Sequence, residues 1–256
     1  MSSMKDKVIV VTGASSGIGR ATALRFAIAR ATVVLVARSK DALESLAEDV
    51  AEAGGTALVI ACDLLQEASV ERIVKETVAK FGGIDVVVNA AGILQSGSVE
   101  TTTLVDWDRM MAINVRSPFY LMQCAMPHLE KRAGNVVNVS SVTGVRAFPG
   151  VLAYCTSKAA MDQLTHCAAL EMAPKGVRIN AVNPGVVVTN LHKSGGMDET
   201  AYKAFLEHSK TTHPLGRAGE ADEVANLIFF LASPDAGWIT GVSMPIDGGR
   251  HQTCAR

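Results

Sequence analysis

The sequence has almost no net charge and no long hydrophobic run, and each absence excludes a class of protein. Its 24 lysines and arginines are balanced by 25 acidic residues, which leaves a net charge of −1. General binding to nucleic acid or to an anionic membrane needs a basic excess, so neither partner is expected. No apolar run approaches the ~18 residues of a membrane span, and the first one is too short for the core of a signal peptide. We therefore expect a cytoplasmic protein.

The sequence also lacks the spacings that build disulfide frameworks or metal sites. Its five cysteines are odd in number and show no C-x-x-C pair, and its six histidines form no H-E-x-x-H motif. We expect free thiols in a reducing compartment and no structural or catalytic metal. The cysteines stand at positions 62, 124, 155, 167 and 254.

What the sequence does contain is an alternation of short β-branched runs with amphipathic segments. Strands are expected at 7–12, 32–37, 56–61, 84–89, 135–140, 177–182 and 242–246. Helices are expected around 18–30, 40–53, 67–81, 103–131, 153–173 and 220–232. The strand segments are nearly continuously apolar, which is typical of a parallel sheet covered on both faces. No linker or repeat interrupts the pattern. It predicts one α/β domain over residues 1–256, a doubly wound Rossmann-type parallel sheet of about seven strands with helices on both faces.

The turn after the first expected strand is rich in glycine. The stretch "KVIVVTG" leads into "GASSGIG", so Gly13, Gly17 and Gly19 directly precede a helix. Glycine permits positive φ and a close approach of backbone to a pyrophosphate, and the helix N-terminus offers free N–H groups. The G-x-x-x-G-x-G spacing differs from the general dinucleotide fingerprint and is a weak signal alone. Its place in the first βαβ unit favours nucleotide binding.

The end of the second expected strand indicates which nicotinamide cofactor fits. An acidic residue there would bind the 2′-hydroxyl of NAD, whereas a basic residue accommodates the 2′-phosphate of NADP. In "VVLVARSKD", Ala37 stands where the carboxylate would be, and Arg38 and Ser39 follow. A guanidinium forks onto phosphate oxygens, so NADP(H) is favoured and NAD(H) is the alternative. The competing interpretation is that Arg38 is only a solvated charge that opens a helix.

Five motifs in order along the chain resemble the short-chain dehydrogenase/reductase family, in its single-domain branch. They are "TGASSGIG", "CDL" at 62–64, "NAAG" at 89–92, "YCTSK" at 154–158 and "NPGVVVT" at 183–189. The resemblance extends to "WITGVSMPIDGG" near the C-terminus and looks closest to 3-oxoacyl-carrier-protein reductases. It implies an NAD(P)-dependent oxidoreductase acting on a small molecule. Members of the family are usually homotetramers that pack the helices at 103–131 and 153–173 against partner subunits, so a homotetramer is expected, with a dimer as the alternative.

The resemblance also implies roles for individual residues. Asp63 would bind the adenine, Asn89 would support the central strand and Thr189 would hold the nicotinamide carboxamide. Ser141 rather than Ser140 matches the family pattern, because it lies thirteen residues before the tyrosine. The implied catalytic set is Asn114, Ser141, Tyr154 and Lys158. The cofactor-binding set is Gly13, Ser15, Ser16, Gly17, Ile18, Gly19, Arg38, Ser39, Asp63, Leu64, Asn89, Ala90, Gly92, Tyr154, Lys158, Pro184, Gly185, Val187 and Thr189.

The chemistry of carbonyl reduction explains why these residue types are needed. The cofactor carries the hydride, and the protein must supply a proton to oxygen and hold the geometry. Tyr154 and Lys158 are about one helical turn apart, so the ammonium would stabilise the phenolate and lower the tyrosine pKa. Lys158 would also donate to the nicotinamide ribose, and Ser141 to the developing alkoxide. An isolated Y-x-x-x-K is usually a contact on a solvated helix face, but Ser141 and the glycine turn in register favour proton transfer.

Asn114 lies inside the expected helix 103–131, with Pro118 four residues later. Proline has no N–H, so the Asn114 carbonyl loses its helical donor and is predicted to hold an ordered water. In the family, the corresponding carbonyl is thought to hold a water that feeds protons toward the lysine. The alternative is an asparagine tolerated at an irregular turn.

Two positions depart from the family pattern. Ala90 replaces a second asparagine, which removes a supporting hydrogen bond, and Arg30 replaces the glycine that normally ends the first helix. A left-handed Arg30 would carry strain of order 1 kcal/mol.

The segment at about 186–215 is expected to form a substrate-binding lid. It contains a short helix capped by Asp198 and hinged by Gly195–Gly196. The alternative is a helix that only packs on the body of the protein. The lid helix has one apolar face, made of Tyr202, Phe205 and Leu206. Apolar residues after the serine strand complete a largely apolar pocket: Val142, Val145 and Phe148. Such a pocket suits a 3-oxoacyl, steroid, alicyclic or aromatic ketone.

The sequence therefore predicts an NADPH-dependent enzyme that reduces a ketone to a secondary alcohol, and the reverse. An NAD-dependent secondary-alcohol dehydrogenase is the main alternative. A non-catalytic NADPH-binding regulatory protein is a third, since fold does not imply function. An epimerase or dehydratase acting on nucleotide sugars would need a second domain, for which 256 residues leave little room.

Overall fold

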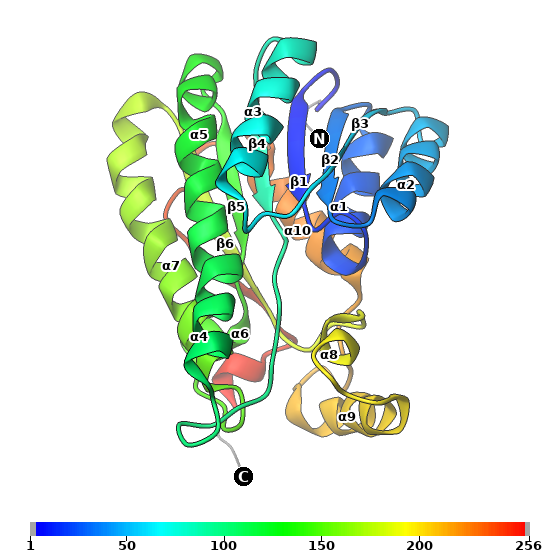
Figure 1. Cartoon of the computed structure of the whole chain (residues 1–256), viewed down its shortest axis with the longest axis vertical. Coiled ribbons are helices and arrows are strands. Elements are labelled where there is room, and N and C mark those ends of the chain that lie inside the picture. Colours follow the sequence, from blue (N-terminus) through cyan, green and yellow to red (C-terminus); the bar gives the residue numbers. More distant parts are fainter. Residues whose placement is uncertain (1–3, 254–256) are drawn as a thin grey trace.

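The apolar runs of the sequence form the strands of one parallel sheet in the computed structural model, which describes residues 4–253 (Figure 1). Within these residues the sheet has seven strands in the order β3-β2-β1-β4-β5-β6-β7, and every neighbouring pair is parallel. This confirms the doubly wound Rossmann-type fold. The strands are β1 (Val8–Thr12), β2 (Thr32–Ala37), β3 (Thr56–Ala61), β4 (Val86–Asn89), β5 (Asn135–Val139), β6 (Arg178–Pro184) and β7 (Ser243–Ile246).

The burial of the strands follows their position in the sheet. Every residue of β1, β4 and β5 is buried, whereas β3 and β7 at the two edges are only partly buried. Continuous apolar runs are therefore found where both faces of a parallel strand are covered. Pro245 lies in the edge strand β7, where a missing N–H costs no internal ladder bond. The expected bounds of β2 and β3 match the observed ones, the other strands differ by at most two residues at an end, and β6 continues through Pro184.

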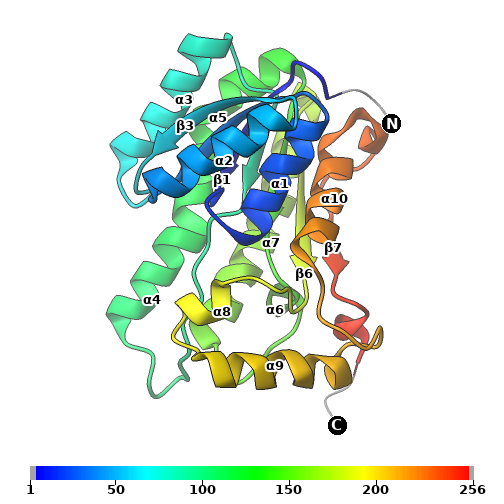
Figure 2. The ribbon, with the colours of Figure 1, turned by 90° about the vertical axis from the view of Figure 1, so that its right-hand side faces the viewer.

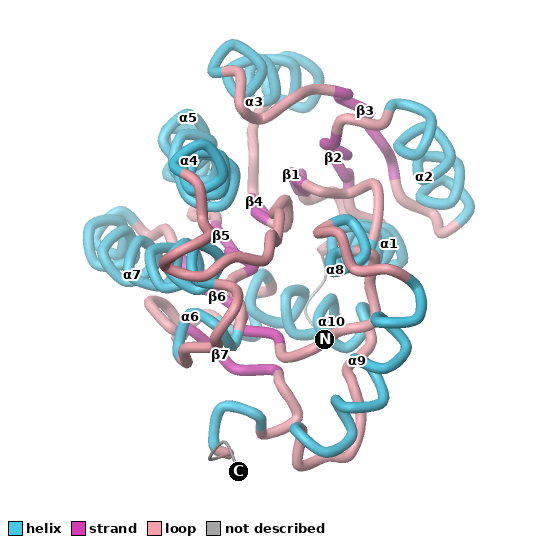
Figure 3. Tube along the Cα trace, turned by 60° about the horizontal axis from the view of Figure 1, so that its bottom comes forward, coloured by secondary structure: helices cyan, strands magenta, loops and turns pink. Residues whose placement is uncertain are grey.

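Helices cover both faces of the sheet (Figure 3). On one face α1 packs against α10, where the Phe26 and Phe229 rings lie 5.3 Å apart, and α2 packs beside α1. On the other face lie α3, α5 and α7, so each face has its own hydrophobic core. The helices are α1 (Gly17–Ile28), α2 (Lys40–Glu52), α3 (Glu67–Phe81), α5 (Ser117–Arg132), α7 (Leu152–Met172) and α10 (Ala221–Ala232).

The helical stretch expected at 103–131 is present but is interrupted by a π-helical turn. The chain forms α4 (Leu104–Met111), then a π-helical turn at Ala112–Arg116, and then α5. The Ser117 N–H donates to the Ala112 carbonyl, five residues earlier, and the Ser117 hydroxyl donates to the same oxygen at 2.8 Å. Pro118 follows directly and contributes no N–H. The missing donor and the extra serine bond both favour the wider turn over a regular α-helix.

Arg30 adopts the left-handed conformation, with φ of 60°. Its N–H donates to the Ala27 carbonyl at 2.8 Å, which closes the C-terminal end of α1. The sequence-based expectation of a strained, non-glycine C-cap is therefore confirmed in its geometry.

Two helices lie at one end of the molecule, past the carboxyl end of β6 (Figure 2). These are α8 (Leu191–Ser194) and α9 (Glu199–Thr212). The Asp198 carboxylate caps α9 by accepting from the Ala201 N–H at 2.8 Å, as expected. The two helices belong to the segment 186–215 that we interpreted as a lid.

Within residues 4–253, no helix combines the length and apolar character needed to cross a membrane. Over the same range, no group of three or more His, Cys, Asp or Glu side chains is arranged to hold a metal. Four cysteines have free thiols, and Cys254 lies outside the described residues.

Candidate active site

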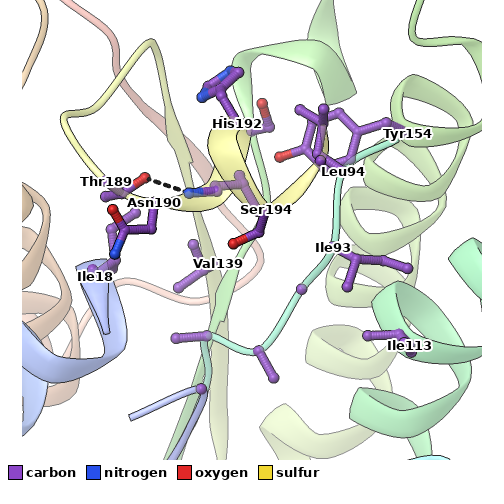
Figure 4. Close-up of a pocket in the computed structure, with 18 of the residues that line it drawn as sticks. Ile18, Ile93, Leu94, Ile113, Val139, Tyr154, Thr189, Asn190, His192 and Ser194 are labelled. Atoms are coloured by element: carbon purple, nitrogen blue, oxygen red, sulfur yellow. Dashed lines mark hydrogen bonds between the residues drawn. The ribbon is translucent and has the colours of Figure 1, made fainter. Parts of the chain in front are cut away.

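A cavity of about 1260 Å³ opens at the carboxyl ends of the strands, where the strand order reverses between β1 and β4. All of the predicted catalytic and cofactor-binding residues line it except Asn89 and Asn114. In Figure 4, Ile18 and Thr189 lie on one side of this space, and Tyr154 extends from α7 toward α8 on the other. The topology thus brings together motifs that are more than 100 residues apart in the sequence.

The glycine turn has the geometry that a pyrophosphate needs. Gly13 and Gly17 have φ of 69° and 52°, and an added Cβ on Gly13 would lie 2.8 Å from Ala91. A Cβ on Gly19 would lie 2.3 Å from the Gly13 carbonyl oxygen, so no larger residue fits there. The Ser16 side chain does not cap α1, which leaves the first N–H groups of the helix free. The turn therefore fits the phosphates of a dinucleotide.

The residues expected near the adenosine half lie along the same cavity. Arg38 is exposed at the end of β2 and forms no hydrogen bond or ion pair with any other of residues 4–253. Ser39 lies beside it, and the Asp63 carboxylate accepts from the Leu65 N–H at 3.0 Å. No carboxylate stands at the end of β2 itself, which ends in Ala37.

Asn89 supports the sheet rather than the cavity wall. Its amide nitrogen donates to the Asn138 side-chain oxygen at 2.9 Å, which ties β4 to β5. This geometry agrees with the expected strand-supporting role and does not place Asn89 in contact with a cofactor. The N–H groups of Ala90 and Ala91 both donate to the Thr12 hydroxyl at 3.1 Å, so this side chain holds the turn after β4 despite the alanine at position 90.

Tyr154 and Lys158 lie on the buried side of α7, 6% and 5% exposed. The Lys158 ammonium lies 5.6 Å from the centre of the Tyr154 ring and donates to the Val139 carbonyl at 2.8 Å. Ser141 hydrogen-bonds the Tyr154 hydroxyl, whereas the Ser140 hydroxyl donates to the main-chain carbonyl of Lys158 at 3.1 Å. The structure therefore places Ser141, not Ser140, beside the phenol.

The expected effect of Lys158 on the Tyr154 pKa is wrong for this structure. Burial raises the pKa of Tyr154 to about 12, and the Ser141 hydrogen bond lowers it only in part. Burial likewise lowers the pKa of Lys158 to about 8, against the attraction of Asp162. Burial outweighs the Ser141 bond at Tyr154 and the attraction of Asp162 at Lys158, because both groups are almost completely removed from water. Tyr154 is therefore protonated at neutral pH.

Asp162 and Asn183 form a buried support that the sequence did not reveal. The Asn183 amide donates to the Asp162 carboxylate at 2.8 Å and to the Ser141 main-chain carbonyl at 2.9 Å. Burial raises the pKa of Asp162, and hydrogen bonds and Lys158 oppose this. Asp162 follows Lys158 by four residues on α7, which was the available signal. The pair fixes the strand end that carries Ser141.

Asn114 lies in the π-helical turn, and its side-chain oxygen is close to Gly92. Its side-chain oxygen accepts from the Ile93 N–H at 2.9 Å, and its amide donates to the Ile93 carbonyl at 2.9 Å and to the Ser157 hydroxyl at 3.0 Å. The side chain thus holds the loop after β4 against α7. The water held by the Asn114 main-chain carbonyl stays a prediction.

The loop after β6 is fastened to α9 through one phenol. The Tyr202 hydroxyl donates to the Thr189 carbonyl at 2.9 Å and accepts from the Thr189 N–H at 3.2 Å. His213 supports the same loop, since its Nε2 accepts from the Val186 N–H at 3.1 Å and its Nδ1 donates to the Ser209 carbonyl at 2.9 Å. Burial lowers the pKa of His213 and keeps the ring neutral.

The other end of the cavity is mostly apolar, with two polar residues that sequence reasoning missed. Val142 and Phe148 line it as expected, but Val145 is 48% exposed and does not. His192 and Arg250 also line it, from α8 and from the C-terminal segment. Figure 4 shows His192 and Ser194 on α8, with the dashed line marking the Ser194 N–H bonded to the Asn190 carbonyl at 2.8 Å. No motif pointed to these positions.

A nucleotide-sized cavity at the switch point of a parallel sheet, with a buried tyrosine, lysine and serine, defines the class of Rossmann-type oxidoreductases. Comparison with known proteins gives the family. A family model described as Enoyl-(Acyl carrier protein) reductase matches residues 13–251. The chain belongs to the short-chain dehydrogenase/reductase family and is an NAD(P)-dependent oxidoreductase, as predicted.

The relatives cover nearly the whole length of the chain. A meso-2,3-butanediol dehydrogenase of Serratia marcescens is 38% identical over 244 residues, covering 95% of this chain and 94% of the relative. A 3-oxoacyl-(acyl-carrier-protein) reductase of Thermotoga maritima is 37% identical and covers 96% of this chain and 98% of the relative. A short-chain dehydrogenase/reductase of Caenorhabditis elegans, solved with cofactor, superposes with a TM-score of 0.92 at 32% identity, covering 98% of this chain and 97% of that one.

Proposed function

We propose that the protein is an NADPH-dependent reductase that converts a ketone into a secondary alcohol, with Tyr154 as general acid. The observation that carries this proposal is the buried Tyr154 hydroxyl, hydrogen-bonded to Ser141 and facing the same cavity as the glycine turn. The named relatives, a butanediol dehydrogenase and a 3-oxoacyl reductase, support a ketone and secondary-alcohol pair. The unpaired Arg38 at the end of β2 supports NADPH over NADH.

Each residue of the site has a distinct part in the proposed reaction. When bound, the nicotinamide cofactor supplies the hydride; the turn at 13–19, Arg38, Asp63 and Thr189 would hold it. Tyr154 is protonated at neutral pH and gives its proton to the carbonyl oxygen. Ser141 donates a hydrogen bond to the same oxygen as charge develops on it. Lys158 stabilises the phenolate that remains and would also bind the ribose.

The surroundings of the site support the rest of the proposal. The apolar lining from Val142, Phe148 and Phe205 suits a substrate with an apolar body. Closure of the segment 186–215 as a lid, a single domain over residues 1–256 and the cytoplasmic location stay predictions. A homotetramer stays a prediction as well, supported by the exposed apolar side chains of Phe119 on α5 and Leu170 on α7.

Replacing Tyr154 with phenylalanine tests the proposal. Fluorescence titration with NADPH and NADH measures binding, and loss of reduced-cofactor absorbance over a panel of ketones measures turnover. Tyr154→Phe should bind NADPH as the wild type does and lose at least about a hundredfold in kcat. Tyr120→Phe is the matched control, since Tyr120 bonds Glu71 away from the cavity. Undiminished reduction by Tyr154→Phe, or binding without any turnover by the wild type, would contradict the proposal.

A further inference from the structure

The substrate end of the cavity contains a half-buried arginine with unused donors. Arg250 lines the cavity, and its guanidinium lies 4.9 Å from the centre of the Phe148 ring, which lines it too. Within residues 4–253 the guanidinium makes one hydrogen bond, to the Thr212 hydroxyl at 2.9 Å. A guanidinium has five N–H donors, so most of them have no acceptor in the described protein.

A second arginine increases the positive charge at this end. Arg146 lies 5.8 Å from the same Phe148 ring and donates to the Arg250 main-chain carbonyl at 2.7 Å. Neither arginine forms an ion pair with any of the described residues. Burial and the charge of Arg146 both lower the pKa of Arg250.

Asp247 is the acidic side chain that acts on Arg250, and its oxygens already accept hydrogen bonds from other groups. Asp247 attracts the guanidinium, but its two oxygens accept from the Gly249 N–H at 3.0 Å, the His251 N–H at 2.6 Å and the His251 ring. Among the described residues that line the cavity, the one carboxylate is Asp63, at the cofactor end. Partial burial and, to a smaller extent, the charge of Arg250 both lower the pKa of His192. Among the described residues, Arg146 and Arg250 therefore face one nearby carboxylate, Asp247, and neither arginine is neutralised by an ion pair.

A half-buried guanidinium is unfavourable unless an anion satisfies it, and it binds carboxylates with two parallel hydrogen bonds. The apolar side chains of Val142 and Phe148 line the same cavity as Arg250 and Tyr154. We infer, on the basis of the proposed function, that the substrate is an oxo acid: a ketone with an apolar body and a remote carboxylate that Arg250 binds. Arg250 is then a specificity-determining residue that selects the acid over its neutral analogues.

Paired substrates test this inference directly. The series consists of levulinate, its longer homologues and para-acetylbenzoate, each compared with its methyl ester at saturating NADPH. For at least one carbon skeleton, the wild type should have a kcat/KM about tenfold to a hundredfold higher for the acid than for the ester, the range of a charge-assisted hydrogen bond. High salt should reduce this preference, whereas it should leave turnover of the ester nearly unchanged.

Variants at position 250 then assign the preference to one side chain. Arg250→Met should bring the acid-to-ester ratio close to one by lowering kcat/KM for the acids far more than for the esters, and Arg250→Lys should give an intermediate ratio. Arg217→Met is the matched control, because Arg217 is exposed and already paired with Glu223, and it should keep the wild-type ratio. Circular dichroism and the unfolding midpoint show whether each variant is folded. The acid-to-ester ratio of the wild type is measured without any variant, so it does not depend on whether the variants fold.

The outcomes separate this inference from the function on which it rests. Esters reduced as well as acids at every chain length would overturn the inference and leave the ketone reductase intact. An acid preference that persists in a folded Arg250→Met would also overturn it. If neither NADPH nor NADH supports reduction of any substrate in the series, this result contradicts the proposed function and the inference with it.

Discussion

Replacing Lys158 with methionine should abolish reduction and yet leave the folded protein as stable as the wild type or more stable. Burial lowers the pKa of Lys158 from 10.5 to about 8. At about 1.4 kcal/mol for each pH unit, holding this charge in the folded protein costs about 3 kcal/mol at neutral pH. Methionine fills a similar volume without a charge, so the substitution removes this cost.

The substitution also removes one hydrogen bond. The Lys158 ammonium donates to the Val139 carbonyl at 2.8 Å, and a buried carbonyl without a donor costs about 1–3 kcal/mol. The net expected change is therefore a stabilisation of about 0–2 kcal/mol. Turnover falls at the same time, because no ammonium remains to stabilise the Tyr154 phenolate. Gain of stability with loss of activity is the pattern expected of a strained catalytic group.

The pH dependence distinguishes the charge effect from a packing effect. Below about pH 8 the lysine is charged in both the folded and the unfolded protein, so the full cost is present. Between about pH 8 and the unfolded value near 10.5, the folded protein has released the proton and the unfolded protein has not. The wild type therefore gains stability with rising pH, by up to about 1.4 kcal/mol per pH unit, and the advantage of the variant shrinks.

Guanidinium unfolding followed by circular dichroism measures these differences, at pH values from about 7 to about 10. Lys75→Met, at an exposed position on α3, is the control and should show no such trend. A difference between wild type and Lys158→Met that stays constant over this range would refute the reasoning. So would a variant less stable than the wild type by more than about 2 kcal/mol at neutral pH.

Three further substitutions test other parts of the structure. Arg38→Ala should weaken NADPH binding by about tenfold or more and leave NADH binding nearly unchanged, as measured by fluorescence titration. Equal losses of affinity for both cofactors would show that Arg38 does not bind the 2′-phosphate. Tyr202→Phe removes both hydrogen bonds to the Thr189 main chain, so it should lower the free energy of unfolding by about 1–2 kcal/mol and raise KM for the cofactor. An unchanged KM would mean that these two bonds do not affect cofactor binding. Asp85→Asn breaks the buried pairing with Arg132 and should cost about 2–3 kcal/mol at neutral pH. Hydrogen bonds lower the Asp85 pKa against the effect of burial, so this cost should disappear as pH falls below about 4; a cost independent of pH would exclude the charge as its source.

The fold could be predicted because its determinants are local. Continuous apolar runs, the amphipathic segments between them and the glycine turn each depend on a few neighbouring residues. The spacing of Tyr154 and Lys158 likewise fixes a common helix face, whatever the rest of the chain does. The cap at Asp198 and the left-handed Arg30 follow from the same kind of short-range rule.

What could not be predicted depends on contacts between distant segments. The direction of the Tyr154 pKa shift is set by burial under other elements, which no four-residue spacing reveals. Arg250 reaches the cavity from the C-terminal segment, about 100 residues after Phe148, and only the tertiary fold brings them together. Asp162 and Asn183 are ordinary polar residues in the sequence, and their partnership exists only where α7 meets β6.

The π-helical turn at Ala112–Arg116 acts as a one-residue insertion within an otherwise helical stretch. Each residue advances an α-helix by about 100°, so deleting one residue here would rotate all of α4 by roughly that angle relative to α5. The deletion would remove the wide turn and displace Asn114 from Ile93, the contact that anchors the loop after β4. In this stretch the length of the chain, as much as its side chains, therefore determines whether the site can assemble.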